Sequence, residues 1–154
     1  MPKIDLSTVP ERRGSGYPPP YDEPCRGRIR RRLADAAHLS DFGVNLLVLA
    51  PGVWSSQRHW HAAEDEFVYV LQGEVVLVTN AGEEVLRSGD CAGFKAGVAD
   101  GHHLQNRSNV DALVLEVGAR KGAEEEVDYP DIDLHFPKGR DTFQHKDGRP
   151  YPRR

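Results

Sequence analysis

Short apolar runs separated by glycine-containing turns occupy the middle of this sequence, from about Val44 to Val117. The runs recur about every 8 to 12 residues, and turns at 72–74, 80–82 and 88–90 divide them. No stretch has the apolar spacing of a convincing amphipathic helix, so the pattern predicts an all-β sandwich or barrel. The expected strands are residues 44–50, 67–71, 75–79, 83–87, 91–94, 104–106 and 112–117.

The segments before and after this central region differ from it in composition. A length of 154 residues fits a single domain with one core. Residues 1–24 are rich in proline, glycine and charge, which is typical of an extended arm. We therefore expect an N-terminal arm over 1–24, a β-barrel over 25–120, and a C-terminal arm over 121–154 that packs on the barrel or on a partner subunit.

Charge and composition narrow the range of partners. The net charge of −4 and the pI near 6.0 give no overall cationic field, so we expect a small-molecule ligand, with neither nucleic acid nor a membrane as partner. An apolar signal region and an apolar run of about 18 residues are both lacking, which predicts a soluble cytoplasmic protein. Cys25 and Cys91 are far apart in sequence, so we predict no disulfide and no thiol metal site.

Five arginines occur among the nine residues from Cys25 to Leu33. One interpretation is a patch that binds phosphate or nucleic acid. The other is an edge strand whose arginines face solvent or pair with acidic residues elsewhere in the chain. The neutral-to-acidic balance of the whole chain favours the second interpretation.

Two histidines and a glutamate lie close together in the segment 52–73. His59 and His61 are two residues apart, and such residues face the same side of an extended chain. Glu66 follows five residues after His61, where a turn would bring its carboxylate back to the same ion. Imidazole nitrogen and carboxylate oxygen together suit one divalent metal ion, which we expect to be zinc, iron, manganese, nickel or cobalt.

Polar residues beside this pair of histidines are candidates for binding a substrate. Ser55 and Gln57 would share the histidines' face of the strand, and Arg58 is a nearby cation for a phosphate group. A solvent-exposed rim would explain the same polar residues equally well. Glu64 and Asp65 are either carboxylates that orient an imidazole from outside the ligand shell or ordinary surface acids.

A second histidine stretch lies at 101–106, so four of the seven histidines fall in two short stretches. The two stretches resemble the two motifs of the cupin superfamily, in which Gly, His-x-His, Glu and Gly are followed by Gly, Pro-x-Gly, His and Asn. The resemblance covers about 44–117, and the separation of the motifs is similar to that in compact bacterial single-domain cupins. The matching positions are Gly52, His59, His61, Glu66 and Gly73, then Gly89, Gly97, His102 and Asn106.

The chain departs from the second motif in two ways. Lys95 stands where proline is usual, and four residues rather than two separate Gly97 from the histidine. Counting back from Asn106 selects His102 as the fourth ligand, and strand alternation then directs His103 to the opposite face. His103 remains the alternative ligand.

The resemblance implies a jelly-roll barrel of six to eight strands that binds one divalent ion through His59, His61, Glu66 and His102. It also implies a metal-dependent enzyme that acts on a small, polar, oxygen-rich metabolite chelated to the ion. Isomerisation of a sugar or sugar phosphate, a lyase reaction and dioxygenase chemistry all occur in the superfamily. The alternative is a non-catalytic module that binds or senses a metal or small molecule. Small cupins commonly pair, so we expect a homodimer.

Overall fold

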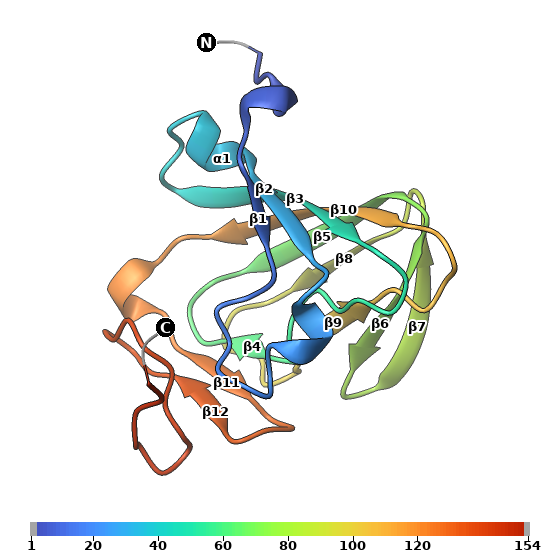
Figure 1. The fold of residues 1–154 in the computed structure, drawn as a ribbon. Coiled ribbons are helices and arrows are strands. Elements are labelled where there is room, and N and C mark those ends of the chain that lie inside the picture. Colours follow the sequence, from blue (N-terminus) through green and yellow to red (C-terminus); the bar gives the residue numbers. More distant parts are fainter. Residues whose placement is uncertain (1–2, 153–154) are drawn as a thin grey trace.

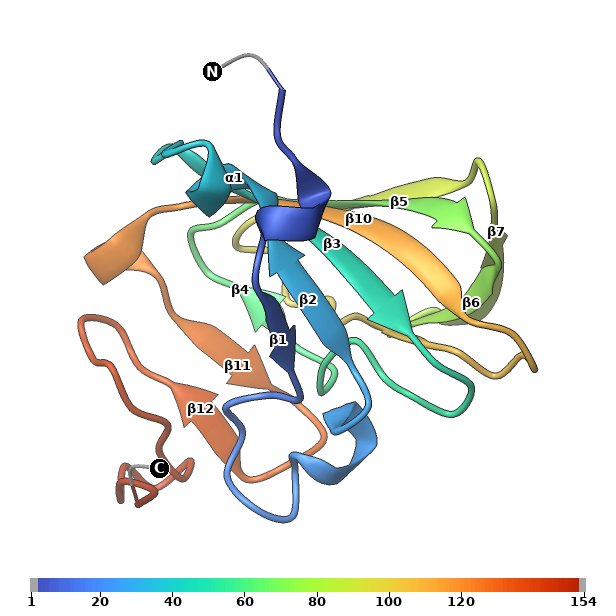
Figure 2. The ribbon, with the colours of Figure 1, turned by 45° about the horizontal axis from the view of Figure 1, so that its top comes forward.

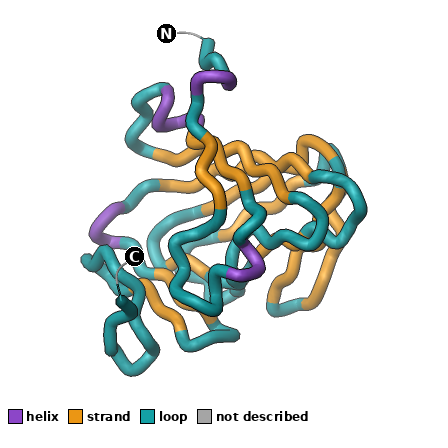
Figure 3. Tube along the Cα trace, in the orientation of Figure 1, coloured by secondary structure: helices purple, strands orange, loops and turns teal. Residues whose placement is uncertain are grey.

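Strands dominate the computed structural model, which describes residues 3–152 (Figure 1). Figure 3 shows how little of the chain is helical. Within the described range no helix has the length and apolar composition that a membrane crossing requires. The helices are the 3-10 helices η1 (Leu6–Thr8), η2 (Glu23–Cys25) and η3 (Gly122–Glu124), and the α-helix α1 (Leu33–Ala36).

The strands of residues 3–152 form three antiparallel sheets, which confirms the predicted all-β fold. Their bounds are β1 (Glu11–Arg13), β2 (Ile29–Arg32), β3 (Phe42–Leu49), β4 (Trp60–His61), β5 (Glu66–Gln72), β6 (Glu74–Thr79), β7 (Gly82–Arg87), β8 (Cys91–Phe94), β9 (His103–Gln105), β10 (Ala112–Ala119), β11 (Val127–Tyr129) and β12 (Leu134–Phe136). One sheet has the order β1-β2-β3-β10-β5-β8, and the smaller sheets have the orders β7-β6-β9 and β12-β11-β4 (Figures 1 and 2).

Alternating side chains explain how these strands enclose a core. In β5, Val68 and Val70 are buried, whereas Phe67, Tyr69 and Leu71 are exposed. Residues i and i+2 share one face of a sheet, so each strand presents one set of side chains to the interior. The main core consists of Leu47, Leu49, Val68, Val70, Val75, Leu77, Leu86, Leu104, Ala112 and Val114.

The outer face of the six-stranded sheet is also apolar. In the register of β5 and β10, Phe67 lies beside Val117 and Tyr69 lies beside Leu115. The exposed fractions of Phe67, Tyr69 and Leu71 are 39%, 37% and 44%. We call these five residues the outer apolar face, and such a surface is typical of a contact with another protein chain.

The segments on either side of the barrel region form a second core. β1 extends the six-stranded sheet, and β11 pairs with β4 and β12. Tyr17 and Cys25 of the N-terminal side pack with Val127, Tyr129 and Leu134 of the C-terminal side. The segments expected as arms therefore contribute strands and buried side chains to the fold.

The arginine-rich segment contains β2, which lies between β1 and β3. Its expected position at a sheet edge is wrong, because β1 pairs with its outer side. Arg31 lies 2.6 Å from a carboxylate oxygen of Glu11, and Arg30 lies 3.1 Å from one of Glu116. The expected pairing with acidic residues therefore holds for these two arginines.

Candidate metal centre

An isolated antiparallel bridge joins the two histidine stretches at His59 and His102. The His59 amide donates to the His102 carbonyl at 3.2 Å, and the His102 amide donates to the His59 carbonyl at 2.8 Å. Residues that face each other in this way project their side chains to the same side. The centroids of the two imidazole rings consequently lie 4.9 Å apart.

Three imidazole side chains converge on one carboxylate oxygen of Glu66. The Nε2 atoms of His59 and His61 lie 3.1 Å apart, as their spacing of two residues predicts. Oε2 of Glu66 lies 3.6 Å from Nε2 of His59 and 3.2 Å from Nε2 of His61. The same oxygen lies 2.8 Å from Nε2 of His102. The ligand atoms of His59, His61 and Glu66 all lie within 4.8 Å of one another.

Glu66 reaches this cluster from the six-stranded sheet. It is the first residue of β5 and pairs with Gly118 of β10 and Phe94 of β8. Its side chain lies on the same face of β5 as the buried residues Val68 and Val70. The expected turn therefore lies at 62–65, between β4 and β5, and it returns the carboxylate of Glu66 to the histidines.

The hydrogen bonds behind the rings of His59 and His61 fix which nitrogens face the cluster. Nδ1 of His59 lies 2.8 Å from the carbonyl oxygen of Gln57, and Nδ1 of His61 lies 3.3 Å from Oε1 of Glu125. With the ring proton on each Nδ1, both Nε2 atoms offer a lone pair to an ion held beside Oε2 of Glu66. Without an ion, the same Nε2 atoms can carry a proton and donate it to that carboxylate oxygen. The donor set therefore fits a divalent metal ion.

His102 and His103 are adjacent at the start of β9, and their side chains point to opposite sides, as strand alternation predicts. His102 faces the cluster, and its ring stacks on Phe94 with a centroid distance of 3.6 Å. Nδ1 of His103 lies 2.9 Å from the carbonyl oxygen of Ser56, and its ring packs edge-on against Trp54. The geometry thus brings His102, and not His103, to the other three candidate ligands.

Glu125 is a site residue that sequence reasoning missed. It is buried, and Oε1 accepts hydrogen bonds from the amides of Ala62 at 3.1 Å and Glu126 at 3.0 Å besides facing His61. Glu64, one of the acids considered for this role, accepts from the Lys121 amide at 2.7 Å, and its carboxylate also lies within 4.8 Å of ligand atoms of His61 and Glu125. The available signal was a run of three glutamates directly before β11, whose pairing with β4 the sequence does not show.

Asp65, the other acid considered, bonds to the loop that follows β8. Its Oδ1 accepts from Nζ of Lys95 at 3.0 Å and from the amide of Ala96 at 2.8 Å. These bonds anchor the loop that follows β8, in which Lys95 replaces the usual proline of the second motif. Asp65 therefore fixes a loop and does not orient an imidazole.

Comparisons with known proteins assign the family. A family model described as "Cupin domain" matches residues 45–118. A crystal structure named as a sugar phosphate isomerase from a cupin superfamily, from Silicibacter pomeroyi, is 43% identical with a TM-score of 0.90. It covers 98% of this chain and 97% of its own. The chain belongs to the cupin superfamily.

Two further relatives of this cupin are more distant. A structure from Acidithiobacillus ferrooxidans, named as a candidate sugar phosphate isomerase, is 28% identical with a TM-score of 0.71 and covers 83% of this chain and 82% of its own. A tetracenomycin polyketide synthase protein of Streptomyces glaucescens is 39% identical over 67 residues. That match spans 44% of the cupin and 43% of the relative, less than half of either chain.

The electrostatics of the cupin's cluster favour a bound cation. Burial alone would raise the pKa of Glu66, but hydrogen bonds with His102, His59 and His61 lower this pKa well below its usual value. The carboxylate is therefore ionised at neutral pH. Burial lowers the pKa of His102, which favours its neutral imidazole. Burial would also lower the pKa of His61, but the hydrogen bond and the negative charge of Glu66 raise it above its usual value, so the cluster favours a positive charge beside Glu66.

The predicted substrate-binding residues differ in their access to the cupin's interior. Ser55 lines a cavity beside the cluster, and its Oγ accepts from the Leu104 amide at 2.9 Å. Gln57 is buried and donates to the Tyr21 carbonyl at 2.7 Å. Arg58 forms an ion pair of 2.6 Å with Asp131. The polar ends of Gln57 and Arg58 are therefore bound within the chain and away from the cavity lining.

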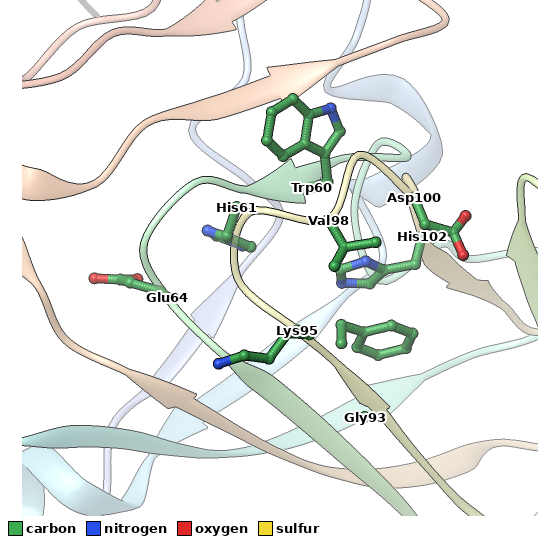
Figure 4. Close-up of a pocket in the computed structure, with 9 residues that line it drawn as sticks. Trp60, His61, Glu64, Gly93, Lys95, Val98, Asp100 and His102 are labelled. Atoms are coloured by element: carbon green, nitrogen blue, oxygen red, sulfur yellow. The ribbon is translucent and has the colours of Figure 1, made fainter.

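Two cavities flank the cluster. The larger has a volume of about 280 Å³ and is lined by all four candidate ligands. Tyr17 and Tyr129 of the second core also line it, so the terminal segments complete its wall. The smaller cavity, of about 220 Å³, shares His61 and His102 with the larger one and is closed by Lys95 and other residues of the loop after β8 (Figure 4).

Proposed function

We propose that this cupin is a metal-dependent enzyme that acts on a small, polar, oxygen-rich metabolite, and that its reaction is the isomerisation of a sugar or sugar phosphate. The observation that carries this proposal is the convergence of three imidazole nitrogens on Oε2 of Glu66 at the wall of the larger cavity. The 43% identical structure named as a sugar phosphate isomerase supports the choice of reaction.

His59, His61, Glu66 and His102 would hold the ion. When bound, it would polarise a carbonyl or hydroxyl oxygen of the substrate as a Lewis acid. Ligand sites usually span about 300–1,000 Å³, so a cavity of about 280 Å³ admits only a small metabolite. Burial raises the pKa of Tyr129 well above its usual value, so its hydroxyl stays protonated in the second core at the cavity wall.

An isomerase must also move a proton between two atoms of its substrate. Glu66 and Glu116 are the carboxylates among the residues that line the larger cavity, and Glu66 is committed to the ion. Glu116 is held by Arg30 at 3.1 Å and by Nδ2 of Asn45 at 3.4 Å. We assign Glu116 the role of the base because it is a positioned carboxylate outside the ligand set.

The test is to load the purified protein separately with each candidate divalent metal and to measure bound metal by mass spectrometry. Turnover is then screened by NMR over aldose and ketose sugars and their phosphates, with oxygen uptake recorded in parallel. Isomer formation without oxygen uptake is the expected result, and Glu116→Gln should abolish it while metal content stays unchanged. Oxygen uptake would indicate a dioxygenase, and ligand binding without turnover would indicate a non-catalytic binding module.

A further inference from the structure

Two arginines of the arginine-rich segment line the same cavity as the candidate metal ligands. Arg30 lies in β2 opposite Leu47, a fully buried core residue of β3, so its side chain is directed to the inner face of the six-stranded sheet. Arg28, two residues earlier, lines the cavity with it. Arg31 has the opposite orientation and pairs with Glu11.

Arg28 is a buried cation without a carboxylate partner in the described part of the chain. The residue is 7% exposed, and its guanidinium donates to the carbonyl oxygens of Gly14, at 2.7 Å from Nη2, and Ser55. Carbonyl dipoles satisfy part of its hydrogen-bonding capacity but do not neutralise its charge. A buried charge with no carboxylate in hydrogen-bond contact is unfavourable, so this position is suited to an anion from outside the chain.

Two polar atoms at the same wall also have unused hydrogen-bonding capacity. Nε of Arg30 and Oγ of Ser15 are buried and have no hydrogen-bond partner among residues 3–152. Arg30 contacts Glu116 through Nη2, whereas its Nε–H has no acceptor among the described residues. Two positive charges, of Arg28 and Arg30, thus face the single negative charge of Glu116 on this part of the cavity lining.

We propose that Arg28 and Arg30, with the hydroxyl of Ser15, form a subsite that binds an oxyanion group, phosphate or carboxylate, of the metabolite held at the metal centre. A guanidinium presents several donors in one plane and matches an oxyanion better than a neutral hydroxyl group. The inference rests on the proposed function because it gives the same small substrate a second contact. Two separate contacts in one cavity would fix the orientation of the substrate.

The experiment measures binding by isothermal titration calorimetry for the full-length protein, with and without bound metal. The probes are inorganic phosphate, ribose 5-phosphate, ribose, and ribonate as the carboxylate counterpart. The variants are Arg30→Gln and its matched control Arg31→Gln, which removes the same charge from the other face of β2. Arg28→Lys is the second variant, and the thermal midpoint of each protein reports its folding.

We expect Arg30→Gln to weaken binding of the anionic probes about tenfold or more, with ribose unaffected and Arg31→Gln like the wild type. The loss should persist in the metal-free protein, because the subsite is formed by side chains. Glu116→Gln should strengthen phosphate binding, because it removes the carboxylate that competes for Arg30.

Equal phosphate binding by Arg30→Gln and Arg31→Gln, or no measurable binding of any anionic probe by the wild type, would overturn the subsite. A loss with ribonate alone would identify the oxyanion as carboxylate, and a loss with the phosphates would identify it as phosphate. Because binding is measured without turnover, the result separates this inference from the proposed function. An inactive protein whose phosphate binding depends on Arg30 retains the subsite and loses the enzyme assignment.

Discussion

Oε1 of Glu125 lies 3.3 Å from Nδ1 of His61, so a residue between η3 and β11 holds a candidate metal ligand of β4. The contact fixes the ring orientation and directs Nε2 of His61 toward Glu66, at 3.2 Å from its Oε2. A hydrogen bond of this kind also makes the imidazole a more basic ligand. The segment that follows the barrel therefore positions a candidate ligand of the metal centre.

Glu125→Ala should weaken metal affinity by about 10- to 100-fold, because partners behind a ligating histidine typically contribute that much. Affinity is measured by competition with a chromophoric chelator. Glu124→Ala is the matched control, since Glu124 is exposed and precedes Glu125 directly. Equal affinities for the two variants would show that Glu125 does not support the ligand.

Leu134→Ala should destabilise the protein by about 2–5 kcal/mol, because it removes a fully buried side chain from the second core. The free energy of unfolding is measured by urea denaturation. Leu39→Ala, at a leucine that is 43% exposed, is the control and should cost far less. A change below about 0.5 kcal/mol for Leu134→Ala would mean that the C-terminal segment does not pack on the barrel.

The middle of the fold could be predicted because its strands are local patterns of apolar residues closed by glycine turns. The expected strand at 91–94 coincides with β8, and the expected strand at 67–71 lies within β5. The sequence could not predict β1 or β11, since each has only three residues and depends on pairing with a distant segment. Such short strands are stabilised by tertiary contacts, and their own residues carry little signal.

The candidate site, too, could be predicted from the sequence only in part. His59 and His61 could be paired from their spacing alone, and His102 required the family resemblance because its bridge to His59 crosses the fold. Arg58 was expected at the pocket because it neighbours His59, but alternation turns it to Asp131. For Arg28 the sequence favours a solvent-facing or ion-paired side chain, because no local pattern indicates that it lines the cavity.

Cys25 should be unreactive toward thiol reagents at neutral pH. Burial raises the pKa of its thiol from 9.0 to about 11, and the thiolate is the reactive form. In a Cys91→Ser variant, which leaves Cys25 as the only thiol, labelling of the folded protein should be slow at pH 8 and should accelerate as the pH rises toward 11. Rapid stoichiometric labelling at pH 8 without denaturant would contradict the burial of Cys25 beneath Tyr17 and Leu134.

The outer apolar face should make the protein a homodimer, because pairing two copies of this face would remove Phe67, Tyr69 and Leu71 from water in both chains. Light scattering should give about twice the chain mass of 17.2 kDa. Tyr69→Lys should shift the protein toward the monomer, and Val85→Lys, at an exposed position on β7, should not. A wild-type protein that stays at 17.2 kDa at every concentration would rule out this dimer.

The metal content of the purified protein and of two histidine variants tests the central claim most directly. The wild type should contain about one divalent ion per chain, and His61→Ala should lose most of it. His145→Ala, whose histidine pairs with Asp133 outside the cluster, should keep the wild-type content. A His61→Ala protein that retains the full metal content, or a wild type that binds no divalent ion when loaded, would contradict the assignment of the metal centre.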